Sequence, residues 1–306
     1  MDEVEEPVSW LPYALICVAP VVWGMSGVLV HWTGLAGHEQ VLVFWRSLFA
    51  SAFFVALILA MRKPALLKPS GQPLLLAASG LATAAFTICA FKAYNMVSIG
   101  TATFIMYLSP VFVALLAPVF LKERLEGTTL VCLAIALAGT GLLAWGQWGG
   151  AGGPALAGSL LAFGSAVFWA ILMITWKRLL EQGASPITVG LYTNGVCALV
   201  YAAFGIPGAA MVSGKGWAVL AVFGVVSIGA AGLSYIYALR RVKAQDAAIL
   251  SYIEPVSATV FGAILLGQSP HWQDYCGAAL IIAAGLLLLH MKSASRIEAV
   301  IDPGER

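Results

Sequence analysis

Charge is scarce in this 306-residue chain: Asp, Glu, Lys and Arg together make up 10% of the residues, whereas 61% are hydrophobic. Soluble globular domains carry about 25% charged residues, so the composition excludes an ordinary soluble enzyme. Catalytic motifs are lacking as well. No HExxH or GxSxG pattern occurs, and the four histidines lie near the ends of apolar segments. An intramembrane enzyme is therefore the least favoured interpretation, and no cofactor or metal is expected.

Paired cysteines and a nucleotide loop are also missing. The five cysteines lie inside apolar segments without paired spacing, so neither a disulfide framework nor a zinc site is suggested. No GxxxxGK[ST] loop for ATP is present. Any uphill transport by this chain would have to draw on the gradient of an ion, with protons as the candidate, or on the gradient of the solute itself.

What the chain does have is long apolar stretches separated by short polar gaps. Ten of them approach the roughly 20 residues that a helix needs to cross the hydrocarbon core. The predicted spans are residues 12–32, 41–61, 73–94, 98–121, 128–145, 157–176, 187–204, 217–239, 244–266 and 273–291. The seventh is the weakest, because it is short and carries Asn194 and several glycines. The sequence predicts an all-α polytopic membrane protein with ten transmembrane helices.

The sequence repeats itself at a shift of about 145 residues. AYNMVSIGTATFIMYLSPVF, residues 93–112, aligns with ALRRVKAQDAAILSYIEPVS, residues 238–257. A tyrosine three residues before a proline within an apolar span occurs in both copies, as Tyr107 with Pro110 and as Tyr252 with Pro255. The repeat predicts two five-helix domains, residues 11–146 and 156–291.

Five spans per repeat force the second copy to cross the membrane in the opposite sense. The charges agree: LKERLEG holds Lys122 and Arg124, while its mate LGQSPHW holds no Lys or Arg. Conversely, NMVSIG has none and its mate RRVKAQ has three. With both termini in the cytoplasm, most Lys and Arg residues lie on the cytoplasmic side. Inverted repeats are typical of secondary transporters, whose substrate sites lie near the bilayer midplane between the halves.

At this point the chain resembles the drug/metabolite transporter superfamily, and in particular the ten-helix EamA-like transporters. The resemblance covers about residues 14–290 and rests on the segments VVWGMSGVL, FWRSLFAS, YLSPVFVALLAPVFLKERL, FWAILMITWKRL and YIEPVSATVFGAILLGQSP. It implies export of small metabolites, often amino acids, across the bacterial inner membrane. One position departs from the pattern, because the mate of Glu123 in the second copy is Gln268.

Glu254 is the outstanding polar residue inside the spans. It lies about ten residues into the ninth span, which is about 15 Å at 1.5 Å per residue and therefore near the midplane. A charged residue at that depth costs about 2.5–3.5 kcal/mol on insertion scales, so its side chain should face water or a partner. It is expected either to bind a substrate ammonium or a coupling proton, or to form a structural hydrogen bond. Pro110 and Pro255 should interrupt their helices at matching depths and are candidate hinges.

Aromatic residues are predicted near the same depth. Tyr107 and Tyr252 lie one turn before the prolines, and Trp23 and Trp169 occupy matching positions near the middle of the first and sixth spans. Together they would form a box for an apolar side chain or a cation, although each alone is as well explained by packing. Other aromatic residues near span ends are expected to form the interfacial belt; among them are Tyr94, Tyr235 and Trp217.

Arg46, about five residues into the second span, is suited to bidentate capture of a carboxylate, or to a structural role by pairing with Glu254 or binding backbone carbonyls. Lys92 lies near a span end and is assigned no role. Asn194 is expected to bond between helices. Alanines four residues apart in the fifth and tenth spans predict close helix packing, between the halves or between protomers; they are Ala134, Ala138, Ala279 and Ala283.

The sequence thus predicts a secondary transporter, a monomer or homodimer, that exports small metabolites, with amino acids first among the candidates. The predicted substrate-binding or cavity-lining residues are Trp23, Arg46, Tyr107, Trp169, Tyr252 and Glu254. A carrier of lipid-linked compounds or nucleotide sugars is the alternative transport function. That alternative would need more basic groups within the spans to hold phosphates.

Overall fold

The computed structural model describes residues 10–35, 37–69, 72–97, 99–145 and 156–301, and within those ranges the chain forms helices and no strand. Ten helical segments are long and apolar enough to cross a membrane. They are 11–33, 39–60, 73–96, 101–120, 127–145, 156–181, 186–205, 214–239, 244–266 and 272–292. The predicted fold class and spans are confirmed, with ends that differ by a few residues. The seventh span is a regular helix.

Each half of the chain supplies five spans, and several spans consist of two pieces. The first half contains α1 (Leu11–Trp23), α2 (Ser26–Thr33), α3 (Glu39–Ala60), the 3-10 helix η1 (Pro64–Leu67), α4 (Pro73–Met96), α5 (Ile99–Met106), α6 (Ser109–Phe120) and α7 (Gly127–Trp145). The second half contains α8 (Leu156–Glu181), α9 (Pro186–Gly205), η2 (Pro207–Met211), α10 (Gly214–Val222), the π-helix η3 (Phe223–Ala231), α11 (Gly232–Leu239), α12 (Ala244–Leu250), α13 (Ile253–Leu266) and α14 (Trp272–Ile301).

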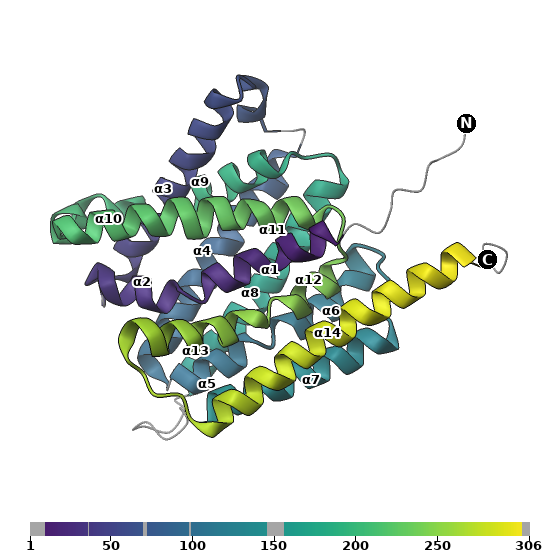
Figure 1. Ribbon diagram of the computed structural model, residues 1–306. Coiled ribbons are helices and arrows are strands. Elements are labelled where there is room, and N and C mark those ends of the chain that lie inside the picture. The colour runs from purple at the N-terminus through teal and green to yellow at the C-terminus, as the bar shows by residue number, and fades with distance from the viewer. Residues whose placement is uncertain (1–9, 36, 70–71, 98, 146–155, 302–306) are drawn as a thin grey trace.

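The two ends of the helix bundle differ in charge. Helix α1 begins and α14 ends on the same side of the bundle, at the right of Figure 1, as an even number of crossings requires. That end also has the loops 121–126 and 240–243, which carry Lys122, Arg124, Arg240, Arg241 and Lys243. We call it the basic face, and the opposite end the far face.

The backbone reproduces the repeat at its turns. Lys122 after α6 and Gly267 after α13 are 145 positions apart, and both have a left-handed φ, 57° and 66°. In both turns the next residue's amide bonds back into the preceding helix: Glu123 N to Ala117 O at 3.4 Å, and Gln268 N to Gly262 O at 3.2 Å. A left-handed conformation costs a residue with a Cβ about 1–2 kcal/mol, so glycine suits this turn and Lys122 adopts it under strain.

The halves pack against each other through helix pairs that include α3 with α9, α4 with α8, and α7 with α14. Glycines permit the close approach: a Cβ added at Gly139 of α7 would lie 2.7 Å from the carbonyl oxygen of Gly277 in α14. The alanines predicted to make such contacts do not make this one. Ala134, Ala138, Ala279 and Ala283 are all exposed on the outside of the α7–α14 pair.

Candidate functional site

Pro110 and Pro255 lie in the first turns of helices that follow an interruption of their spans. Residues 107–108 separate α5 from α6, and residues 251–252 separate α12 from α13. Shorter-range bonds bridge each gap, from Val111 N to Leu108 O at 2.9 Å and from Glu254 N to Ser251 O at 3.0 Å. The expected interruptions are therefore present at matching positions in both halves, because proline has no amide hydrogen for the regular bond.

The tyrosines before these prolines bring the two interruptions together. The rings of Tyr107 and Tyr252 stack with centroids 5.9 Å apart and an angle of 29° between their planes. The hydroxyl of Tyr252 donates a hydrogen bond of 2.8 Å to the carbonyl oxygen of Tyr107. Tyr252 is fully buried and Tyr107 half-buried. The contact joins the first half of the chain to the second at the points where their helices are interrupted.

Glu254 follows directly on this contact, near the start of α13. Its side chain is half-buried, and its carboxylate makes no hydrogen bond or ion pair with any residue that the structure describes. It does interact electrostatically with the hydroxyl groups of Tyr94, Tyr107 and Tyr235. A carboxylate in the middle of a span without a basic partner among these residues is available for a cation or a proton.

The predicted tryptophans also meet. Trp23 and Trp169 contact each other edge to face at 5.6 Å, and Trp23 lies 5.3 Å from the ring of Tyr235. Phe86 and Trp176 extend the group, at 5.0 Å and 6.2 Å from Trp169. We call these five residues the aromatic wall. They come from α1, α4, α8 and α11, and therefore from both halves of the chain.

The π-helix η3 lies against the aromatic wall. The indole nitrogen of Trp23 donates a hydrogen bond of 3.0 Å to the carbonyl oxygen of Ser227, inside η3. The α1–α2 interruption follows at Gly24, and a Cβ there would lie 2.6 Å from Ala258 N and 2.8 Å from Glu254 O. The backbone of α1 thus touches α13 beside Glu254, and π-helical segments are frequent at functional sites.

Arg46 lies apart from this group. It is buried among α3, α9 and η3, with its guanidinium carbon 5.5 Å from the ring centre of Phe223 and with electrostatic contacts to Cys197 and Tyr201. No ion pair joins it to Glu254 among the described residues, so this structure does not show the pairing that was one of the alternatives for Arg46. Asn194 differs from expectation as well, because its amide donates to Gly190 O at 2.9 Å within its own helix.

At the basic face, polar contacts tie the halves together. The carboxylate of Glu123, before α7, accepts hydrogen bonds from Ala244 N at 2.9 Å and from Gln245 N at 3.5 Å. These amides form the first turn of α12, which an anion stabilises. The side chain of Gln245 returns a bond of 3.4 Å to the carbonyl oxygen of Arg124. Glu123 therefore caps a helix that belongs to the other half.

An ion-pair network reinforces this contact. The carboxylate of Glu126 lies 2.6 Å from Lys243 Nζ and 2.7 Å from Lys292 Nζ, and Lys292 also lies 3.4 Å from the carboxylate of Asp246. Hydrogen bonds from the two lysines hold the pKa of Glu126 below its ordinary value. We call these four residues the latch. Asp246 is 2% exposed in its side chain, and its Oδ1 has no hydrogen-bond partner.

Comparison with known proteins places this geometry in a family. The model of the EamA-like transporter family matches residues 10–145 and again residues 156–290, and so covers nearly the whole chain in two copies. The chain belongs to the EamA-like transporter family. It is thus a multi-pass membrane transporter of the drug/metabolite transporter superfamily, as the sequence predicts.

The relatives of this EamA-like transporter include proteins with assigned substrates. The biotin transporter of Escherichia coli K12 is 24% identical over 96% of this chain and 98% of its own length. The probable terminal-alkyne amino-acid exporter of Streptantibioticus cattleyicolor is 26% identical over 68% of this chain and 69% of its own length. A solved crystal structure with 21% identity, covering 94% of this chain and 98% of its own, superposes with a TM-score of 0.78. That likeness shows the fold alone.

Some residues of this transporter escaped the sequence reasoning. Tyr235 is fully buried instead of belonging to an interfacial belt, and its hydroxyl lies 3.0 Å from the hydroxyl of Ser251 at the α12–α13 interruption. Tyr94 contacts Glu254 electrostatically, and Trp217 packs on Trp45 at 4.5 Å. The sequence placed these three residues near span ends, and for that reason it predicted an interfacial belt for them.

Proposed function

We propose that this EamA-like transporter exports a small zwitterion, foremost an amino acid with an apolar or aromatic side chain. The unpartnered carboxylate of Glu254 beside stacked Tyr107 and Tyr252 carries the proposal. A carboxylate suits the ammonium group of the solute, and aromatic faces suit either that cation or an apolar side chain. In this proposal Trp23 and Trp169 line the same site. The named exporter of an alkyne-bearing amino acid in Streptantibioticus cattleyicolor supports this substrate class.

Transport would proceed by alternating access between the two repeats, residues 11–146 and 156–291. The two family-model matches, at 10–145 and 156–290, support this division. Pro110 and Pro255 would act as hinges, since each lies in the first turn of a helical segment at an interruption beside the site. Glu254 would exchange the solute's ammonium group for a proton, which would couple export to the proton gradient.

Charge distribution supports one orientation in the bacterial inner membrane. With the basic face toward the cytoplasm, both termini are cytoplasmic and the positive-inside rule is obeyed. The latch would then close the cytoplasmic side of the transporter. The exposed small-residue faces of α7 and α14 are compatible with a homodimer as well as with a monomer.

A second candidate is a solute like biotin, because the Escherichia coli biotin transporter matches nearly the full length of the chain. Biotin has a carboxylate and no amine, so Glu254 would not serve as its counter-ion. The charge of the preferred solute therefore separates the two candidates.

The test is counterflow into proteoliposomes that contain the purified protein, with labelled aromatic, branched and small amino acids and with biotin. Glu254→Gln should abolish uptake driven by a pH gradient and should raise the KM of the solute exchange that remains without a gradient, because glutamine neither carries the proton nor balances the ammonium charge. Glu181→Gln is the matched control, because it removes an acidic side chain 44% exposed whose ion pair, with Lys177 at 3.9 Å, lies at the basic face. Driven uptake that persists in Glu254→Gln would reject the coupling role of Glu254, and exchange with an unchanged KM would reject its role in binding the ammonium group. Exchange of biotin alone would reject the amino-acid substrate.

A further inference from the structure

A second charged group lies buried within the spans, and its charge is not balanced by the protein. Arg46 is 9% exposed, and its Nε has no hydrogen-bond partner. None of the described residues forms an ion pair or hydrogen bond with its side chain, and its guanidinium carbon lies 5.5 Å from the ring centre of Phe223. A guanidinium has five donors in a planar fork that matches an anion.

The ring of Phe223 does not compensate this charge. A cation–π contact contributes about 0.5–2 kcal/mol. Placing an arginine at the centre of a span costs about 2.5–3.5 kcal/mol on insertion scales and more in simulations. The free energy of burying the arginine exceeds what the cation–π contact returns. An arginine at this depth therefore indicates a further partner of negative charge.

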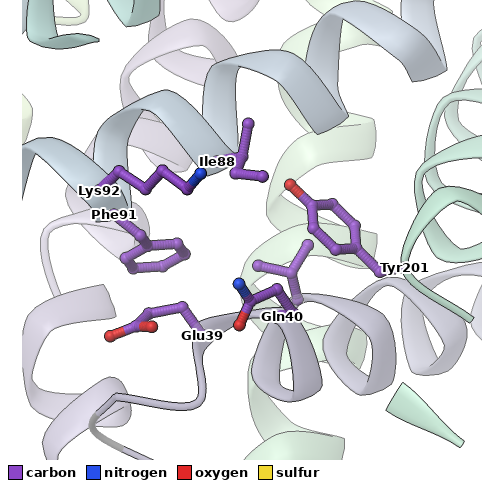
Figure 2. Close-up of a pocket in the computed structure, with 7 residues that line it drawn as sticks. Glu39, Gln40, Ile88, Phe91, Lys92 and Tyr201 are labelled. Atoms are coloured by element: carbon purple, nitrogen blue, oxygen red, sulfur yellow. The ribbon is translucent and has the colours of Figure 1, made fainter. Parts of the chain in front are cut away.

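A small cavity lies about one helical turn from Arg46 along α3, on the side of the far face, and Arg46 itself is not part of its lining. It has a volume of about 20 Å³ and is lined by residues of α3, α4 and α9, among them Lys92 and Tyr201 (Figure 2) as well as Val43. Val43 lies one helical turn from Arg46 along α3, and Tyr201 interacts electrostatically with it. A cavity can hold one water molecule once this volume reaches roughly 10–15 Å³. This cavity therefore has room for a single group about as large as a water molecule.

The charges at the cavity favour an anion. The amino group of Lys92 and the hydroxyl of Tyr201 point into the same space from α4 and α9, as Figure 2 shows. The hydroxyl proton of Tyr201 is engaged by Ala84 O at 2.8 Å. Glu39, the acidic residue of the lining, accepts a hydrogen bond of 3.0 Å from Gly37 N. Lys92 and Glu39 carry opposite charges at the cavity, so the charge left uncompensated beside it is that of Arg46, which attracts an anion.

We infer that Arg46 is the centre of an anion site, reached from the far face past Lys92, that takes one compact negative group. That group is either a free inorganic anion such as chloride or the carboxylate of the transported solute. The site is separate from Glu254, and its chloride form does not depend on the proposed amino-acid substrate. In the carboxylate form, which rests on the proposed function, Arg46 would hold the solute on its way out.

The test measures thermal stability of the full-length protein in detergent while chloride replaces isethionate, a bulky sulfonate, at constant ionic strength. A group that binds only the folded protein raises the melting temperature along a saturating curve. Arg46→Gln should lose that response, Arg46→Lys should keep a weakened one, and Lys92→Gln should shift it to higher chloride. The matched control is Arg240→Gln, an exposed arginine on the basic face, which should respond as wild type does.

A second arm replaces chloride by a transported amino acid or by its amide, both in chloride-free buffer. Stabilisation by the amino acid and not by its amide, lost in Arg46→Gln, assigns the site to the solute carboxylate. Stabilisation by chloride alone assigns it to the inorganic ion, even if no amino acid is transported. Wild-type protein that responds to neither ligand overturns the inference, and this result does not depend on whether any variant folds. A response that survives in Arg46→Gln overturns it as well.

Discussion

Lys292 should be the residue on which the latch depends most. Its side chain is 14% exposed and lies between Glu126 and the carboxylate of Asp246, which is 2% exposed. Lys292→Met leaves Asp246 buried without its cation, and breaking a buried pair costs about 3–5 kcal/mol. The lost contact with Glu126, which is 39% exposed, adds only about 0–1 kcal/mol. The expected fall in melting temperature is roughly 5–15 °C.

The assay is thermal unfolding in detergent, with two further variants. Lys243→Met removes the other cation of Glu126, but this side chain is 44% exposed, so the expected loss is about 0–1 kcal/mol. Lys292→Met combined with Asp246→Asn removes both buried charges and should recover most of the stability. Equal, small losses in the two single lysine variants, or a double variant less stable than Lys292→Met, would refute the reasoning.

Three other changes test the site and the latch. Gly24→Val should abolish transport, because its Cβ would collide with α13, whereas Gly27→Val, where nothing lies within 4 Å, should transport normally; equal uptake by both would contradict this. Because the folded protein lowers the pKa of Glu126, its stabilisation exists above the unfolded value of about 4.3 and is lost as the pH falls below it. In a plot of melting temperature against pH, Glu126→Gln should therefore fall less steeply than wild type on the acid side. Parallel curves for the two proteins would contradict the predicted loss of stability at low pH. Tyr252→Phe should lower the free energy of unfolding by about 1 kcal/mol, measured by thermal unfolding, whereas Tyr237→Phe, at an exposed position, should not change it. If both variants unfold as wild type does, the hydrogen bond from Tyr252 to Tyr107 adds no stability.

Local patterns in the sequence were enough to predict the spans and the interruptions. Apolar length defines a span directly, and proline interrupts a helix through its own missing amide. The repeat then linked Tyr107 to Tyr252 across 145 residues, and the structure brings these rings into contact. Each of these predictions depends on properties of a few neighbouring residues.

Predictions that depended on the direction of a side chain around a helix were weaker. Sequence depth placed Arg46 and Glu254 near enough to pair, but they point into different groups of helices. The same limit explains the alanines of α7 and α14, which face outward while Gly139 and Gly277 make the contact. The sequence singled out Glu123 but not its role, because its partner is a helix terminus and backbone amides leave no trace in the sequence.

The latch lies at one end of the molecule, and aromatic packing holds the other. At the far face, Trp45 packs on Trp217 at 4.5 Å and donates a hydrogen bond of 3.0 Å to Gly205 O. At 0.1 M, dissolved salt screens exposed charges over about 10 Å, as in the Lys243–Glu126 pair, but it screens the buried Lys292–Asp246 pair much less and leaves ring contacts unaffected. Opening at the basic face and opening at the far face would therefore differ in their dependence on salt. Ionic strength would therefore change the ease of opening at the basic face only through the exposed pair, by about 0–1 kcal/mol, while opening at the far face would proceed at a rate indifferent to it.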